Sequence, residues 1–342
     1  MAAHLRANIF RYRLSNSGLL VAIQKCGFSS SESVIEYRNR LFDEEKKRQR
    51  DNIGRIEKIE VRYIGVPKNE TLIVNKDIST PYNCAQHISE SLLRISAVAV
   101  VNGHQWDLHR PLKESCTLQL VNFRSKDTIG VNQAFWRTCS FVLGGVLETV
   151  FKDDSGIYLH SFPKPDIKSG SFTYDFALKN QNWEPSPTEL KAIGIEMCNF
   201  AAQNDKIERL DVSHDIALEM FKTNPFKREQ LPNISNQNNG IITLYRAGKH
   251  IDISKGTMIG STQFIRKARI ASVHKILKDD SELYRIQGIA LPTGFTLSTY
   301  AFNILSDRAK KLNTIGLQQN SSEKNDNQEH PEESTSKMKQ RI

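Results

Sequence analysis

Residues 130–150 read Gly-Val-Asn-Gln-Ala-Phe-Trp-Arg-Thr-Cys-Ser-Phe-Val-Leu-Gly-Gly-Val-Leu-Glu-Thr-Val, a stretch with the spacing of a long helix. Its apolar positions recur at helical intervals, which is typical of a helix that packs along one broad face. Arg137 and Phe141 are four residues apart and therefore lie on the same side of the predicted helix. The apolar stripe consists of Val131, Phe135, Phe141, Val142, Leu143, Val146, Leu147 and Val150.

The size and composition of the chain indicate a globular protein. Its 342 residues are enough for one large or two ordinary domains, each with its own core. Hydrophobic residues make up 39% of the sequence and the mean hydropathy is negative. No apolar run approaches the roughly 20 residues that span a bilayer, so we expect no membrane span.

The charge balance favours a polyanionic partner. There are 47 Lys and Arg against 38 Asp and Glu, which gives a net charge of +9. Basic side chains that neutralise phosphates drive the binding of RNA and DNA. A modest basic excess is also common in proteins that touch no nucleic acid, so charge alone leaves both possibilities open.

The cysteines are five in number and scattered. None pairs at the two- to four-residue spacing of a zinc ribbon. An odd number without a pattern also argues against a secreted disulfide framework. We expect reduced thiols, most of them buried, and no metal or other cofactor. The five are Cys26, Cys84, Cys116, Cys139 and Cys198.

The first 30 residues have the composition of a mitochondrial transit peptide. They contain Arg6, Arg11 and Arg13 among serines and leucines, and no acidic residue precedes Glu32. Such acid-free, Arg-rich, amphipathic segments are typical of mitochondrial import, whereas a secretory signal has one uninterrupted apolar block. We expect residues 1–30 to direct the chain to the mitochondrial matrix, and an ordinary disordered terminus is the alternative.

The other end of the chain, residues 316–342, is polar. It is rich in Gln, Asn, Ser, Glu and Lys and almost free of apolar side chains. Because such a segment cannot bury enough surface to offset its conformational entropy, we expect a disordered tail.

Residues 31–56 are expected to form a basic helical extension. Ser33-Val-Ile-Glu36 matches a capping box, in which each of the two side chains bonds the other's backbone amide. A charge run follows with its acids first and its bases last, as suits the helix dipole. A solvated helix explains this run as well as an RNA contact does. If the helix meets RNA phosphates, the candidates are Lys46, Lys47, Arg48, Arg50 and Arg55.

Residues 57–124 have the element order of a β-grasp domain. Strands are predicted where apolar residues alternate. Thr80 and Pro81 supply a helix cap and a first-turn proline, and Asn102-Gly103 is a hairpin signal. The expected elements are strands at 59–63, 71–75, 97–101 and 118–121, with one helix after Thr80 between the second strand and the third.

Residues 130–315 alternate helical and strand patterns, so they are expected to form one α+β domain. Thr188 is the predicted cap of its second helix, and the polar stretch Asn233–Asn239 is predicted to be a surface loop. The expected elements are helices at 130–150, 188–204, 213–221 and 298–312, and strands at 157–161, 170–178, 207–212, 241–245, 263–267, 271–274 and 285–291.

Several stretches resemble the amino-terminal part of threonyl-tRNA synthetases. Residues 97–108, Ala-Val-Ala-Val-Val-Asn-Gly-His-Gln-Trp-Asp-Leu, are similar to the TGS domain at the head of those enzymes. Residues 170–178, Gly-Ser-Phe-Thr-Tyr-Asp-Phe-Ala-Leu, and the helix at 130–150 resemble their editing domain. The resemblance implies the fold class α+β, with a β-grasp, TGS-like domain at 57–124 and an editing-like α+β domain at 130–315. It also implies RNA, because TGS domains are non-catalytic modules associated with nucleic acid.

The same resemblance shows what the chain lacks. The editing domain carries two histidines four residues apart on its helix and a Cys-x-x-x-His sequence after a strand, and the matching positions here are Arg137, Phe141, Ser254 and Met258. Arginine and phenylalanine are not ligands, and serine and methionine are poor ones. We therefore expect no metal, no catalytic residue and no small-molecule substrate. Because the chain also matches neither the synthetase catalytic domain nor an ATP-binding Gly-x-x-x-x-Gly-Lys-Ser/Thr loop, we expect no aminoacylation.

The whole combination resembles a family of proteins of the mitochondrial ribosome's large subunit. The resemblance spans roughly residues 34–312 and includes Glu57-Lys-Ile-Glu-Val61 and Phe135-Trp-Arg137. It implies a non-catalytic structural role, with the large-subunit rRNA and other mitochondrial ribosomal proteins as partners.

Two groups of residues outside the extension are further candidates for RNA contact. Arg266, Lys267 and Arg269 form a second basic cluster, and Arg137 places a cation where the synthetases have a ligand. Plain solvated charge explains the cluster equally well. Two other functions stay open: a free-standing aminoacyl-tRNA deacylase, and a regulator that binds tRNA or mRNA transiently.

Overall fold

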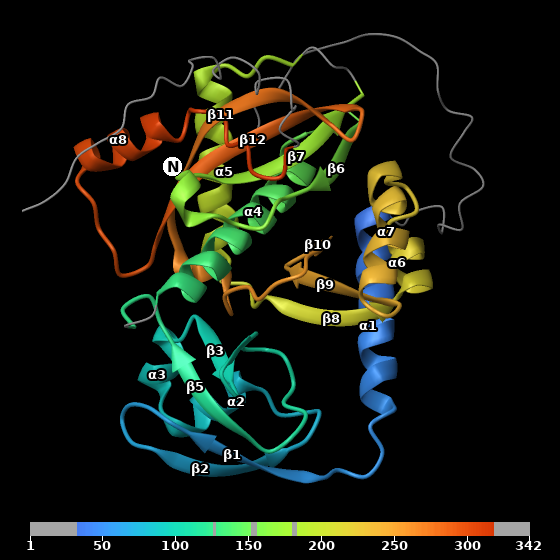
Figure 1. Cartoon of the computed structure of the whole chain (residues 1–342), viewed down its shortest axis with the longest axis vertical. Helices are drawn as coiled ribbons and strands as arrows, with labels where there is room; N and C mark the ends of the chain where they lie inside the picture. The colour runs from blue at the N-terminus through green and yellow to red at the C-terminus, as the bar shows by residue number, and fades with distance from the viewer. Residues whose placement is uncertain (1–32, 126–127, 152–155, 180–182, 318–342) are drawn as a thin grey trace, which may run out of the picture.

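The computed structural model describes residues 33–125, 128–151, 156–179 and 183–317. The expected transit peptide and nearly all of the expected polar tail lie outside these residues. The described chain forms a β-grasp unit and a larger α+β unit, so the predicted α+β class is confirmed (Figure 1). In the described part of the chain, no helix is both long and apolar enough to cross a membrane.

The β-grasp unit is built on a five-stranded mixed sheet with the order β2-β1-β5-β3-β4. β1 runs parallel to β5, and all other neighbours are antiparallel. Alternate residues of β1 are buried, and Val61 packs with Leu72 and Leu118 in the core. In chain order the elements are β1 Lys58–Tyr63, β2 Glu70–Asn75, α2 Pro81–Ile88, α3 Glu90–Ile95, β3 Val98–Val101, β4 His104–Trp106 and β5 Cys116–Val121.

The helical part of this unit is divided, where the sequence predicted one helix. Ser89 adopts extended backbone, with φ −168° and ψ 134°, and separates α2 from α3. Serine favours such boundary positions because its side chain competes for backbone groups inside a helix. The predicted Thr80 cap is confirmed, since its hydroxyl accepts from the Asn83 amide while the Asn83 side chain accepts from the Thr80 amide.

The larger unit places one long helix, α4, between two antiparallel sheets (Figure 1). The four-stranded sheet has the order β11-β12-β7-β6, and the three-stranded sheet has the order β10-β9-β8. The elements are α4 Ile129–Val150, β6 Ile157–Ser161, β7 Phe172–Leu178, α5 Pro187–Ala202, β8 Glu208–Ser213, α6 His214–Met220, α7 Pro225–Gln237, β9 Ile241–Ala247, β10 His250–Ile253, β11 Ile265–Lys278, β12 Ser281–Pro292 and α8 Thr299–Arg308.

Two glycines allow α4 to approach both sheets at one level. A Cβ at Gly144 would lie 2.6 Å from the Tyr174 ring on β7, and one at Gly145 would lie 2.9 Å from Cγ of His250 on β10. Any larger residue would therefore push the helix away from one sheet. The apolar stripe predicted for this helix forms the centre of the main core.

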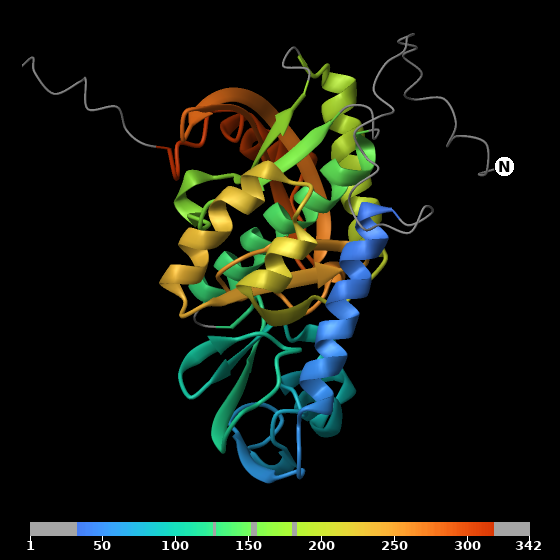
Figure 2. The same ribbon diagram turned by 90° about the vertical axis from the view of Figure 1, so that its right-hand side faces the viewer.

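Helix α1 Val34–Asp51 is packed against the protein. Its predicted capping box is present, and Phe42 is fully buried in a core with β8, β9, α6 and α7. Figure 2 shows α1 running along the larger unit towards the β-grasp unit. The expected extension is thus held by one apolar side and exposes the other.

Three local predictions in the larger unit were wrong. Most of the stretch predicted as a loop, Asn233–Asn239, belongs to α7, because the Asn224 cap and buried Leu231 support a helix there. Helix α5 is capped by Ser186, with Pro187 in its first turn, so Thr188 lies inside the helix. The two strands predicted at 263–267 and 271–274 are one long strand, β11, whose register shifts absorb the irregular pattern.

The remodelled synthetase-like pocket and the candidate RNA interface

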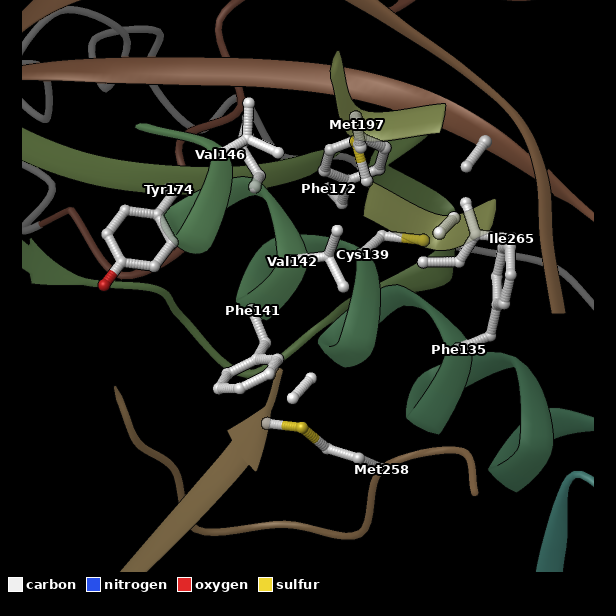
Figure 3. Packing of buried hydrophobic residues seen from close by; sticks show 14 of the residues in the cluster. Phe135, Cys139, Phe141, Val142, Val146, Phe172, Tyr174, Met197, Met258 and Ile265 are labelled. Atoms are coloured by element: carbon white, nitrogen blue, oxygen red, sulfur yellow. The ribbon is translucent and has the colours of Figure 1, made fainter. Parts of the chain in front are cut away.

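Phe141 and Met258 lie side by side in the apolar core, although they come from distant parts of the chain (Figure 3). Phe141 is fully buried, and its ring lies 4.7 Å from the ring of His250. Met258 is also buried, and its flexible thioether suits an irregular space against an aromatic ring. Both positions, which the sequence resemblance matched to synthetase ligands, are therefore filled by hydrophobic packing.

Arg137 lies one turn before Phe141 on α4 and points into the same region. Its Nη1 donates to the Thr257 carbonyl at 2.9 Å, and only 9% of the residue is exposed. A Cβ at Gly256 would lie 2.4 Å from Cζ of Arg137, so a larger residue there would have to displace the guanidinium. Burial lowers the pKa of the guanidinium. This internal position does not favour the RNA contact suggested for Arg137.

Ser254, the fourth replaced position, lies just beyond β10 and is buried. Its amide donates to the Thr243 carbonyl at 3.2 Å, which continues the pairing of the sheet. The loop that follows carries Thr257 and Met258 towards α4, so the two halves of the expected pocket do meet. What they form is a packed junction. Among the described residues, no three His, Cys, Asp or Glu side chains gather as a metal site would require.

Asp107 of the β-grasp unit closes this junction from the other side. It is 3% exposed, and its carboxylate accepts from the hydroxyl of Tyr245 at 3.0 Å and from the amide of Met258 at 3.0 Å. Nη1 of Arg209 lies 3.3 Å from the same carboxylate. Burial raises the pKa of Asp107, and Arg209 opposes that shift. The sequence shows Asp107 only as part of the TGS pattern, and no local signal indicates partners so far along the chain.

Further contacts beside Asp107 fix the β-grasp unit to the same loop. The Gly260 amide donates to the Ala97 carbonyl at 2.9 Å, and the Gly260 carbonyl bonds Nε2 of His109 at 3.0 Å. Leu108 is buried over Gly260, where a Cβ would lie 2.5 Å from Cδ1 of the leucine. The loop that would carry the second half of an editing site is therefore covered by another unit of the chain.

A buried ionic cluster joins α1 to the carboxy-terminal end of α4. Glu148 of α4 accepts from Arg38 of α1 at 3.0 Å and from Nδ1 of His250 at 2.6 Å. Burial alone would raise the pKa of Glu148, but Arg38 and His250 outweigh it and lower the pKa to about 2. The carboxylate is therefore ionised at neutral pH, and its two contacts join α4 to α1 and to β10.

The first group of candidate RNA contacts lies on α1 and just after it. Lys46 pairs with Glu208 at 2.5 Å, and Arg48 pairs with Glu45 at 2.6 Å. The other three are exposed, and in the part of the chain that the structure describes they form no ion pair: Lys47, Arg50 and Arg55.

The second group lies on β11, beside α8, and is separate from the first (Figure 1). Arg266 is exposed. Nζ of Lys267 lies 4.0 Å from the centre of the Phe302 ring, and Nη1 of Arg269 donates to the Asn303 side chain at 2.7 Å. Two of these three cations thus have contacts with α8 that a nucleic acid would have to share.

Comparison with known proteins agrees with this architecture. The TGS domain pattern matches residues 63–122. Large ribosomal subunit protein mL39 of Drosophila melanogaster is 54% identical over 290 residues, which are 84% of this chain and 87% of that protein. The chain belongs to the mL39 family.

This member of the mL39 family is also similar to threonine–tRNA ligases. Cytoplasmic threonine–tRNA ligase 2 of Homo sapiens is 33% identical over 218 residues, and cytoplasmic ligase 1 of Bos taurus is 32% identical over 218 residues. These alignments cover 63% of this chain in both cases, but only 25% and 28% of the ligases. The relationship to threonyl-tRNA synthetases predicted from the sequence is therefore confirmed, and it is limited to about a quarter of those enzymes.

Proposed function

We propose that this chain is a non-catalytic structural component of the large subunit of the mitochondrial ribosome, where it contacts rRNA and neighbouring ribosomal proteins. The observation that carries the proposal is the 54% identity to mL39 across most of both proteins. The acid-free, Arg-containing composition of residues 1–30 supports a location in the mitochondrial matrix.

The packed junction at the synthetase-like pocket supports the absence of catalysis. Phe141 and Met258 fill its interior, and the carboxylate of Asp107 accepts hydrogen bonds from Tyr245 and from the Met258 amide. A hydrolytic site needs a positioned water or metal and a group that can accept a proton. At this junction both carboxylate oxygens of Asp107 already accept hydrogen bonds, from Tyr245, the Met258 amide and Arg209.

The exposed cations support RNA contact. Lys47 and Arg50 lie in the last part of α1 and Arg55 in the segment after it, whereas Arg266 lies on β11. Cations without an internal acidic partner can neutralise phosphates without first losing an ion pair. Lys46, Arg48, Lys267 and Arg269 stay candidates, but each has an intramolecular contact to exchange.

The test is sedimentation of a mitochondrial lysate that contains the tagged full chain through a sucrose gradient at moderate salt. The proposal expects the chain in the fractions that hold the large-subunit rRNA, and expects it to leave those fractions when the rRNA is digested. Recovery of the chain in the light fractions alone would contradict the proposal. As a separate check on catalysis, purified chain should release no amino acid from mischarged tRNA.

A further inference from the structure

The segment after β12 exposes a large amount of apolar surface. Every residue from Thr293 to Tyr300 is exposed. Phe295 is 40% exposed, Leu297 is 42% exposed and Tyr300 is 77% exposed. On α8, Ile304 and Leu305 are 38% and 37% exposed. We refer to these five side chains, Phe295, Leu297, Tyr300, Ile304 and Leu305, as the α8 surface.

Helix α8 is apolar on two sides. Phe302 and Ala309 are buried against Ala271 and Ile289, which fixes the inner side of the helix on β11 and β12. Tyr300 and Ile304 are four residues apart, so they project together on another side. A helix at the surface of a monomer normally presents polar residues to water on that side. Figure 1 shows α8 at the periphery of the molecule, beside β11.

The distribution of charge around this surface favours a protein over a nucleic acid. No Asp, Glu, Lys or Arg occurs between residues 293 and 306. An RNA site needs cations in the contact itself, because phosphates dominate the affinity. Here cations border the apolar centre: Arg124 donates to the Gly294 carbonyl at 3.2 Å, Arg269 donates to Asn303, and Arg266 is exposed on β11 next to Ile265, which pairs with Pro292. The nearby acid on α8, Asp307, is paired with Lys310 at 2.8 Å. An apolar centre with a charged rim is the usual composition of a protein interface.

We propose that the α8 surface binds a segment of another protein that carries large apolar side chains flanked by carboxylates. The apolar residues of that segment would cover Tyr300 and Ile304, and its carboxylates would face Arg266 and the other rim cations. The carboxy-terminal residues of this chain do not fit, because residues 318–342 contain only Met338 and Ile342 as large aliphatic side chains. The inference rests on the proposed function only in expecting this partner within the large subunit.

A photocrosslinker at position 300 tests the proposal. The full chain is produced with benzoylphenylalanine in place of Tyr300 and irradiated in intact mitochondria, and the crosslinked peptide is sequenced. The expected product is one other protein, joined at a segment that contains apolar residues with Asp or Glu nearby. The same reagent at Ile73, an exposed position on β2, is the control and should not capture that peptide. Crosslinking to RNA, to a second copy of this chain, or to nothing would overturn the proposal, as would capture of one peptide from both positions.

Two surface variants test the chemistry of the contact. In the photocrosslinking chain, Ile304→Asp should lower the yield of the crosslink by about tenfold, because it places a charge in the apolar centre. Arg266→Glu should lower the yield several-fold, because it opposes the partner's carboxylates. Ile73→Asp is the matched control and should leave the yield unchanged. An unchanged yield in Ile304→Asp or in Arg266→Glu would contradict the proposed contact.

Sedimentation of the same samples separates the two proposals. If the chain is absent from the large-subunit fractions but crosslinks to an apolar, acidic protein segment, the proposed function fails and the α8 surface stands. If the chain sediments with the subunit but position 300 crosslinks to RNA, only the inference about the α8 surface fails.

Discussion

Asp107 is one residue on which the junction of the two units depends. Its two oxygens serve Tyr245, Arg209 and the Met258 amide, and none of these groups lies in its own unit. A buried carboxylate is costly unless it is fully bonded, and its partners are equally costly to leave unpaired. Asp107 therefore couples the stability of the β-grasp unit to the position of the loop that carries Met258.

Asp107→Ala should lower the free energy of unfolding by about 3 kcal/mol, because it leaves the buried Tyr245 hydroxyl and Met258 amide without their acceptor and removes one of the two carboxylates that Arg209 contacts. Urea denaturation followed by tryptophan fluorescence measures the change. Asp215→Ala is the control, since that side chain is 96% exposed and its loss should cost less than about 0.5 kcal/mol. Equal stabilities for the two variants would show that the Asp107 contacts contribute little.

Glu148 should make stability depend on acid pH. Its pKa falls from 4.5 to about 2 in the folded chain, so the folded state holds the charged form more tightly than the unfolded state does. The resulting stabilisation, about 3 kcal/mol, is complete above pH 4.5 and is lost as the pH falls towards 2. Glu148→Gln should therefore be less stable at pH 7 and show a flatter stability profile below pH 4.5.

The measurement for Glu148 is urea denaturation at a series of pH values between neutrality and acid. Glu44→Gln is the matched control because Glu44 pairs with Arg40 in an exposed, helical ion pair, which contributes little. The control should follow the unsubstituted chain at every pH. If the stability of Glu148→Gln showed the same pH dependence as that of the unsubstituted chain, the contacts of Glu148 with Arg38 and His250 would not be the cause of that dependence.

For helix α5 the sequence predicted the right type of capping residue at the wrong position. The sequence predicted a cap at Thr188, whereas Ser186 accepts from the Glu189 amide and Glu189 bonds back to the Ser186 amide. Pro187 between them lacks an amide hydrogen, so it fits the first helical position at no cost. Both serine and threonine favour caps, and only the third-residue glutamate distinguishes them.

Ser186→Ala should destabilise the protein by about 1 kcal/mol, whereas Thr188→Ala should be close to neutral. Both side chains are exposed, so neither substitution opens a cavity and each serves as control for the other. Thermal denaturation of the two variants provides the comparison. A larger loss for Thr188→Ala would mean that the helix begins two residues later in solution.

The elements that the sequence predicted well are those whose pattern is local. The alternation in β1, the capping box of α1 and the apolar stripe of α4 each lie within one element, and all three occur in the structure. α7 was missed because its helical face depends on Leu231 packing against distant strands, while its own sequence is polar and contains Pro232. The Asp107 contacts were missed for the same reason, since they join segments that only the tertiary fold brings together.

The exposed candidate cations lie on separate elements of the molecule. Lys47 and Arg50 lie in the last part of α1, Arg55 follows it, and Arg266 lies on β11. Figure 1 shows β11 beside α8 and away from α1. If RNA lies against the end of α1, affinity should depend on the charges of Lys47, Arg50 and Arg55 through counterion release, which makes it dependent on salt. The centre of the α8 surface is apolar, so binding there should depend on salt less strongly than RNA binding at α1 does, and the two contacts can be distinguished in one experiment.

Lys47→Gln, Arg50→Gln and Arg55→Gln combined should weaken association with the large subunit and make it less sensitive to salt. Each phosphate contact contributes about 0.8 to the slope of log affinity against log salt, so the loss of three contacts should reduce the slope by about 2. The fraction of chain that sediments with the subunit is measured over a salt series. A charge-matched control, Arg40→Gln, Arg94→Gln and Lys310→Gln, removes three exposed cations that pair with neighbouring acids on helices or just after one. Identical slopes for the two triple variants would show that the α1 cations act only through net charge, because a specific phosphate contact must depend on where the charge lies.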